Sequence, residues 1–198
     1  MLKTVIRVGP EDHGKRMSLA DFDHAEVQEG YLYELGRGVI VVSDVPGLRH
    51  FGQLNNLRRQ LNVYDVKHPD RIYAVAGGAE CKLLLWNFES ERHPDLSIYL
   101  KPPPHRRDVW SLWVPDIVIE IVSKSSVQRD YDEKREEYFS FGVREYWIVD
   151  ADEQRVLVLR RWGRRWREIE VRPPDVYETR LLPGFKLDVA AIFNAIES

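Results

Sequence analysis

The chain has 198 residues, of which 43% are hydrophobic and 31% charged, so it is long enough for one well-buried domain and short for two. Its formal net charge of -3 excludes a strong basic field over the whole surface, which weighs mildly against tight non-specific binding to nucleic acid. The single cysteine, Cys81, excludes an intrachain disulfide and a zinc site made of several cysteines. No apolar run approaches the roughly 18 residues that span a membrane, and the first residues lack a signal-peptide core, so we expect a cytoplasmic protein without a membrane partner.

The first half of the chain predicts a short helix, a pair of strands and one long helix, in that order. Ser18 is a good N-cap, so a short helix is expected to begin directly after it. Residues 31–42 are typical of two strands joined by a tight turn at residues 36–38. Over residues 48–64 apolar side chains recur at three- and four-residue steps, which indicates a helix.

The second half predicts mainly strands around one further helix. Residues 79–87 and 93–100 are each expected to form a strand, and residues 114–122 form a third, strongly apolar one. The pattern over residues 130–141 predicts a helix that ends at Gly142, because glycine is enriched directly after helix C-termini.

The C-terminal part predicts a strand pair at residues 145–150 and 155–162, and a short closing helix at residues 189–196. Strands and helices that share one core predict an α/β (α+β) fold with a central mixed sheet flanked by helices. We expect residues 1–17 to be a polar lead-in and residues 18–198 to form one domain.

Two acids on the strand at residues 114–122 are the most informative feature of the chain. Asp116 and Glu120 are four residues apart, so their side chains share one face of an otherwise apolar strand. An unpaired buried carboxylate is costly, and a divalent metal or a lysine is its expected partner. Asp95 opens the preceding strand, so antiparallel pairing of the two strands would bring it close to Glu120. Two or three carboxylates with an open side are typical ligands of Mg²⁺ or Mn²⁺.

A simpler role is open to each of these acids. Asp95 and Asp116 follow Pro94 and Pro115, and a proline-aspartate pair is common in turns, so either aspartate could merely cap a turn. Glu120 lies among aliphatic residues in the middle of its strand, where such a role is less expected.

Three further residues are candidates for the same site. Lys134 lies early in the predicted helix, where its cation could orient an attacking water or stabilise a pentavalent transition state; the alternative is a solvated helix residue. His50 opens the long helix, and Glu34 ends the first strand of the predicted pair. Either could be an outer ligand or position a water, and a structural role is at least equally open to both.

Arginines gather around two tryptophans in the predicted C-terminal hairpin. The tryptophans are Trp162 and Trp166, and the surrounding arginines are Arg160, Arg161, Arg164, Arg165 and Arg167. Such a cluster could grip a nucleic-acid backbone with the help of stacking aromatics. A solvated hairpin is the alternative, and the sequence favours it slightly.

Seven segments keep a common order and spacing from about Ser18 to the C-terminal helix: S-L-A-D-F, Y-E-L-G-R-G-V-I-V, H-F-G-Q-L, H-P-D-L-S-I, V-P-D-I-V-I-E-I-V-S, D-E-K-R-E-E-Y and G-V-R-E-Y-W-I-V-D. In these segments the chain resembles the Uma-two family of endonucleases, within the PD-(D/E)XK restriction-endonuclease-like superfamily. The resemblance implies a central mixed sheet flanked by helices, Mg²⁺-dependent cleavage of DNA phosphodiester bonds and, often, a homodimer.

The resemblance also implies roles for individual residues. Asp95 matches the proline-aspartate position, and Glu120 matches the acid of the (D/E)XK triplet, so these two would hold the metal. The lysine position of the triplet is Val122 here, and Lys134 matches a lysine carried by the following helix. Asp116 belongs to a second proline-aspartate pair with a metal-binding or structural duty.

Lys124 is a second candidate for the catalytic cation. The family often reads S-P-S after the acidic strand, whereas residues 123–125 of this chain read S-K-S. The sequence therefore leaves open whether Lys134 or Lys124 serves the reaction.

Two functions of different classes follow from these residues. The first is a metal-dependent endonuclease in which a water bound to Mg²⁺ at Asp95 and Glu120 attacks the scissile phosphate with the help of Lys134. The alternative is a catalytically inactive module that binds nucleic acid or a partner, since a fold does not fix a function.

Overall fold

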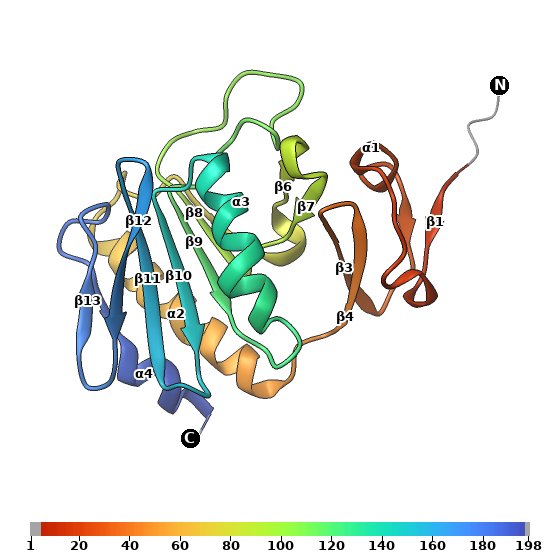
Figure 1. The fold of residues 1–198 in the computed structure, drawn as a ribbon. Helices are drawn as coiled ribbons and strands as arrows, with labels where there is room; N and C mark the ends of the chain where they lie inside the picture. Colours follow the sequence, from red (N-terminus) through yellow and green to blue (C-terminus); the bar gives the residue numbers. More distant parts are fainter. Residues whose placement is uncertain (1–4, 197–198) are drawn as a thin grey trace.

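A six-stranded mixed sheet forms the centre of the computed structural model, which describes residues 5–196 (Figure 1). In pairing order its strands are β12 (Arg165–Val171), β11 (Arg155–Trp162), β10 (Glu145–Asp150), β9 (Ile117–Ile121), β8 (Leu96–Tyr99) and β5 (Ala74–Ala76). β9 and β10 are parallel, and the other neighbours are antiparallel. Every residue of β9 and β10 is buried, which agrees with their nearly continuous apolar sequences.

Helices cover both faces of this sheet. They are α2 (Leu48–Lys67) and α4 (Val189–Phe193) on one face, and α3 (Lys134–Phe141) on the other. Ile119 of β9 packs in the α2 and α4 core, whereas Val118 packs in the α3 core. Side chains alternate along a strand, so the side chain of Glu120 points toward α3, like that of Val118.

A smaller antiparallel sheet lies beside the central one, between it and α1 (Figure 1). In pairing order its strands are β4 (Val39–Asp44), β3 (Tyr31–Gly36), β7 (Ser90–Arg92) and β6 (Leu83–Leu85), and the helix is α1 (Leu19–Phe22). A separate core cluster, which includes Leu35 and Phe22, joins this sheet to the helix. The molecule thus has two sheets, and the strand β7 brings polar residues from the smaller sheet toward α3.

Short elements complete the fold. The strands are β1 (Arg7–Val8), β2 (Glu26–Val27), β13 (Val176–Glu178) and β14 (Lys186–Asp188). The 3-10 turns are Pro10–Asp12, Gly78–Glu80, Trp86–Phe88 and Asn194–Ile196, and a π-helical turn, Arg129–Glu133, leads directly into α3. None of the helices in residues 5–196 is long and apolar enough to cross a membrane.

The fold class predicted from sequence, a central mixed sheet flanked by helices, is confirmed. The Ser18 cap is present, since its hydroxyl accepts a hydrogen bond from the Asp21 amide at 3.1 Å. The turn between β3 and β4 is tight because Arg37 and Gly38 both adopt positive φ, 52° and 75°.

Two sequence-based expectations need correction. The strand expected at residues 79–87 shrinks to the three residues of β6, because 3-10 turns flank it on both sides. The expected lead-in contains β1, which pairs with β2 and buries Val8, so its residues 5–17 pack as part of the structure; residues 1–4 of the lead-in lie outside the described residues.

Candidate active site

An open cleft of about 870 Å³ runs between the smaller sheet and one edge of the central sheet. Its lining comes from β3, β4, the start of α2, the end of β9 and the π-helical turn. Five of the six site residues proposed from sequence line this cleft: Glu34, His50, Asp95, Glu120 and Lys134.

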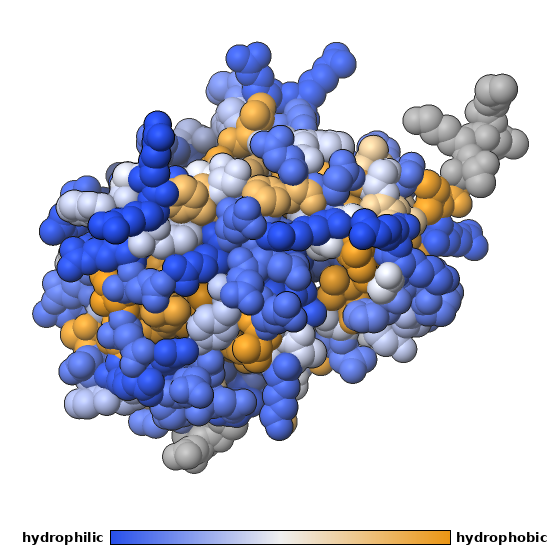
Figure 2. Space-filling view, viewed as in Figure 1, coloured by the Kyte–Doolittle hydropathy of each residue, from blue (hydrophilic) through white to orange (hydrophobic). Residues whose placement is uncertain are grey.

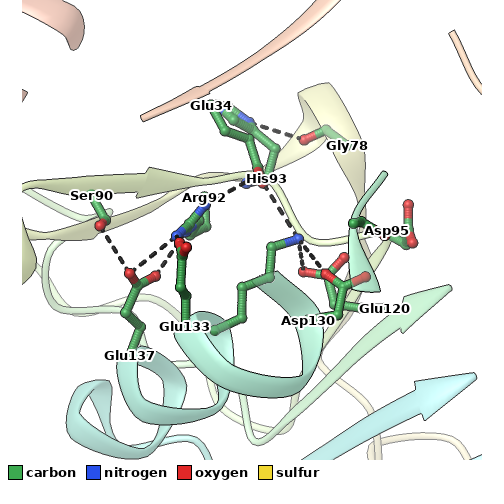
Figure 3. Close-up of polar contacts among 12 residues, drawn as sticks. Glu34, Gly78, Ser90, Arg92, His93, Asp95, Glu120, Asp130, Glu133 and Glu137 are labelled. Atoms are coloured by element: carbon green, nitrogen blue, oxygen red, sulfur yellow. Dashed lines mark hydrogen bonds and ion pairs between the residues drawn. The ribbon is translucent and has the colours of Figure 1, made fainter. Parts of the chain in front are cut away.

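Asp95 and Glu120 meet where β8 pairs with β9. Leu96 lies opposite Ile119 in this antiparallel pairing, so the residue before Leu96 lies beside the residue after Ile119. Figure 3 shows the two carboxylates side by side. The predicted approach of Asp95 to Glu120 is therefore confirmed, and both acids face one cleft.

Asp95 is held at both oxygens. Its Oδ2 accepts a hydrogen bond from the Ile121 amide at 2.7 Å, and its Oδ1 lies 3.0 Å from His50 Nε2. Gly77 packs closely against the backbone of Asp95, directly before β8. A Cβ added at Gly77 would lie 2.0 Å from the backbone oxygen of Asp95. Only glycine fits at this close approach, so Gly77 fixes the position of Asp95.

Glu120 is almost fully buried, with 4% of its surface exposed. Its Oε1 accepts a hydrogen bond from the Tyr138 hydroxyl at 2.6 Å and lies 3.0 Å from Lys134 Nζ. Burial raises the pKa of Glu120 to about 8; Lys134 opposes this rise, and the neighbouring Asp95 adds to it. Among the described residues Oε2 has no hydrogen-bonding partner, so this oxygen is available to a ligand in the cleft.

Lys134 lies among three carboxylates on the first turn of α3. Its Nζ lies 3.0 Å from Glu120, 3.2 Å from Asp130 and 3.7 Å from Glu34. Burial lowers the pKa of Lys134, but the attraction of these carboxylates, of Glu120 above all, outweighs burial and raises the pKa. The ammonium therefore stays charged and is directed at the protein's own acids.

Arg92, on β7, is the second buried cation and is fully enclosed. Its Nε donates to Glu137 at 2.7 Å, and its two terminal nitrogens donate to Glu133 at 3.1 Å and Glu34 at 3.4 Å (Figure 3). Burial raises the pKa of Glu34, but Lys134 and Arg92 outweigh it and lower that pKa to about 2. We call the set Glu34, Arg92, Asp130, Glu133, Lys134 and Glu137 the ion network; Arg92, Asp130, Lys134 and Glu137 are its buried members.

His93 contacts two acids at one side of the network, Glu34 and Glu91. The backbone amide of His93 donates to Glu34 at 3.0 Å, and His93 Nε2 lies 3.0 Å from a Glu91 oxygen. Burial lowers the pKa of the His93 imidazole, but Glu91 and Glu34 outweigh it and raise the pKa. The protonated ring would donate to Glu91. The backbone directly after β7 anchors Glu34 through the His93 amide.

Asp116 lies outside the cleft. It comes directly before β9, its Oδ2 accepts from the Leu100 amide at 3.0 Å, and its Oδ1 lies 2.9 Å from an Arg144 nitrogen. Asp116 does share a strand face with Glu120, but four residues of strand separate their backbones by roughly 13 Å. The sequence-based grouping of Asp116 with the site is therefore corrected to a structural role at the other end of the strand.

Lys124 lies on the loop that follows β9 and lines the cleft. It is exposed, and it forms no ion pair with any residue in the 5–196 range. The two candidate lysines thus differ in state, because Lys134 is buried and paired with protein acids whereas Lys124 is free to meet a ligand.

Several residues of the site were not recognised from the sequence: Arg92, Asp130, Tyr138 and Gly77. For Asp130 and Tyr138 a signal was present, since both are four residues from Lys134 and share its helix face. A π-helical turn precedes α3 at this point, a feature that recurs at functional sites. Arg92 carried no such signal, because an S-E-R triplet does not predict a buried strand.

The cleft offers oxygen ligands of the kind that Mg²⁺ or Mn²⁺ prefers. Within residues 5–196 no group of three or more His, Cys, Asp or Glu side chains is placed to hold a metal ion. Mg²⁺ is commonly held by only one or two carboxylates, with waters and substrate phosphates completing its shell. Asp95 and Glu120, with the free Oε2 of Glu120, fit this two-carboxylate pattern.

Comparisons with known proteins agree with this geometry. Residues 19–190 match the Uma2 family, which is described as "Putative restriction endonuclease". A crystal structure described as "a putative nuclease belonging to DUF820" from Anabaena variabilis superimposes with a TM-score of 0.72 at 20% identity, covering 91% of this chain and 99% of that one. At this identity the likeness shows a shared fold. No curated protein matches the chain.

Proposed function

Because the chain belongs to the Uma2 family, we propose that it is an endonuclease that hydrolyses DNA phosphodiester bonds with the help of Mg²⁺ or Mn²⁺. One observation carries the proposal: Asp95 and Glu120 lie side by side on an open cleft, with a lysine 3.0 Å from Glu120. This combination of two acids and a lysine suits metal-assisted phosphoryl chemistry.

In this proposal Asp95 and Glu120 would hold the cation. A divalent cation there would neutralise charge on the scissile phosphate and lower the pKa of an attacking water. His50 holds Oδ1 of Asp95, and the Ile121 amide holds Oδ2, so the carboxylate is oriented before any ligand binds. This preorganisation avoids reorganisation during the reaction.

Lys134 acts in this proposal as a positioning residue. It lies against Oε1 of Glu120 and is directed at protein carboxylates rather than into the open cleft. Its charge favours the ionised form of Glu120, against the burial that raises the pKa of that acid. Lys124, exposed on the cleft, is the cation that would contact a DNA phosphate.

A supercoiled plasmid tests the proposal. The wild type is incubated with Mg²⁺, Mn²⁺ or EDTA beside Glu120→Gln and the matched control Asp116→Asn, a similar change near the other end of the same strand. We expect metal-dependent nicking by the wild type and the control, and none by Glu120→Gln. Undiminished cleavage by Glu120→Gln would refute the assignment of the site.

A catalytically inactive binding module is the second candidate. One observation favours it: Oε1 of Glu120 is already engaged by Tyr138 and Lys134, and burial raises the pKa of this acid to about 8. DNA binding without cleavage in every metal would support this candidate over the nuclease. A homodimer and a cytoplasmic location stay predictions.

A further inference from the structure

A second groove, of about 780 Å³, lies on the side of α3 that faces away from the cleft. One wall is α3, through Arg135, Glu136 and Phe139, and the other is the hairpin of β11 and β12. α3 therefore separates two cavities, and consecutive residues serve different ones: Lys134 lines the cleft and Arg135 lines the groove.

Fixed contacts fasten the hairpin to α3. The guanidinium of Arg161 lies 3.9 Å from the Phe139 ring centre and 5.5 Å from that of Trp166. Arg161 Nε donates to the Val143 carbonyl at 2.9 Å, and Trp166 Nε1 donates to the Arg135 carbonyl at 2.9 Å. The groove is thus preformed, and Arg161 is engaged in holding its wall.

Two cations of the groove remain unengaged. Arg164 and Arg165 lie at the tip of the hairpin, are exposed, and make no ion pair within residues 5–196. The lining carboxylate Glu136 is engaged by Arg37 at 2.7 Å, so it does not neutralise them. Figure 2 shows strongly hydrophilic side chains gathered over this end of the sheet, around β12.

The balance of charge in the groove identifies its ligand. Four arginines line it, Arg135, Arg161, Arg164 and Arg165, against two carboxylates, Asp132 and Glu136, although the whole chain has a net charge of -3. Arg135 is paired with Glu168 at 2.5 Å, so the positive charge open to a ligand comes from Arg164 and Arg165. Guanidinium groups bind phosphate oxygens in a bidentate manner and are weakly hydrated, which suits them to a phosphodiester backbone.

We propose that this groove binds the phosphate backbone of DNA through Arg164 and Arg165, as a contact separate from the cleft. The inference rests on the proposed function, because it assigns a second contact to the same substrate. Neither arginine lines the cleft, so the groove adds affinity and positions the duplex without touching the reacting phosphate.

The test is the salt dependence of DNA binding. A labelled duplex is titrated in EDTA at several salt concentrations with Arg164→Gln/Arg165→Gln and with the matched control Arg59→Gln/Arg180→Gln. The control removes two exposed arginines that form no ion pair in the described chain and lie outside both cavities. Each lost phosphate contact lowers the slope of log K against log salt by about 0.9.

For the groove variant, Arg164→Gln/Arg165→Gln, we expect the slope of log K against log salt to fall by about 1.8 in magnitude. We expect the slope of the control variant to change far less. Arg164→Lys/Arg165→Lys keeps both charges and should restore most of the slope. Equal changes in the groove and control variants, or no change in either, would overturn the inference. Thermal unfolding of each variant verifies that folding is intact.

The failure of this inference and the failure of the proposed function are distinguishable. Binding is measured in EDTA and needs no cleavage. If the groove variant shows the reduced salt slope but the wild type cleaves DNA in no metal, DNA binding by the groove is supported and the proposed nuclease activity is refuted. Cleavage together with an unchanged slope in the groove variant would refute the groove and leave the nuclease standing.

Discussion

The two sides of α3 hold cations in opposite states. On the inner side Lys134 and Arg92 are buried, and each meets three carboxylates. On the outer side Arg164 and Arg165 are exposed and meet none among the described residues. A buried charge must be paired within the protein, whereas an exposed, unpaired one can be paired by a ligand. The inner side is therefore expected to govern stability and site geometry, and the outer side to govern association.

The replacement Arg92→Met tests the inner side most severely. It leaves the buried Glu137 and the partly buried Glu34 with less compensating charge, which we expect to lower the free energy of unfolding by about 3–5 kcal/mol. Urea denaturation measures this loss, with Arg164→Met as the control at about 0.5 kcal/mol or less. Similar losses in the two variants would remove the basis of the comparison.

Acidification should reduce the stability that the ion pairs on the inner side of α3 contribute. The folded-state pKa of Glu34 is lowered from 4.5 to about 2, so its stabilisation is present above pH 4.5 and is lost as the pH falls toward 2. We expect Glu34→Gln to be less stable than the wild type near neutral pH, and the difference to shrink on acidification. Urea melts across this range measure it. A difference that stays constant with pH would contradict the role assigned to Glu34.

Replacing each of the two lysines of the cleft should affect a different step: Lys134 the turnover and Lys124 the binding of DNA. Lys134→Gln removes the support of Glu120 and is expected to lower kcat about 10–100-fold, as changes to metal-supporting residues typically do. Lys124→Gln should leave kcat close to normal, raise KM and lower the salt slope by about 0.9. Steady-state kinetics on a defined duplex distinguish them. The reverse pattern would make Lys124 the cation that serves the reaction.

The smallest expected effect concerns the support beneath Asp95. Gly77→Ala places a Cβ against the backbone oxygen of Asp95, and overpacking of this kind costs about 1–3 kcal/mol. The comparison change Gly47→Ala meets no atom within 4 Å, so its expected cost is only that of a poorer N-cap for α2, about 0.5–1 kcal/mol. Thermal unfolding and plasmid nicking measure both effects. Equal behaviour of the two variants would show that the strand start adapts freely.

The sequence was a good guide wherever chemistry and local pattern coincided. Asp95 precedes one apolar strand and Glu120 lies within the next, so pairing of the two strands was enough to predict that the acids meet. The lysine was a weaker prediction, because its own sequence context is also typical of a solvated helix residue. The family resemblance supplied the assignment of Lys134, whereas strand alternation and spacing had already marked the acids.

The misses have physical causes. Alternation along a strand fixes the face of Asp116 but says nothing about which end of the strand the cleft occupies. Arg92 lies in a polar triplet whose burial depends on acids 41 and 45 residues further along the chain, and no local pattern reports such partners. The solvated hairpin that the sequence slightly favoured is solvated only in part. Arg161 and Trp166 of the β11–β12 hairpin pack on α3, whereas residues 162–165 between them are exposed.

The parallel pairing of β9 with β10 has a consequence for how the site is assembled. Parallel neighbours need a crossover segment, and here the crossover is the π-helical turn and α3, which carries Lys134. The chain therefore cannot align β10 with β9 without also delivering the lysine to the face of the sheet that carries Glu120. The topology of the chain thus ties the parallel pairing of the two strands to the placement of Lys134 beside Glu120.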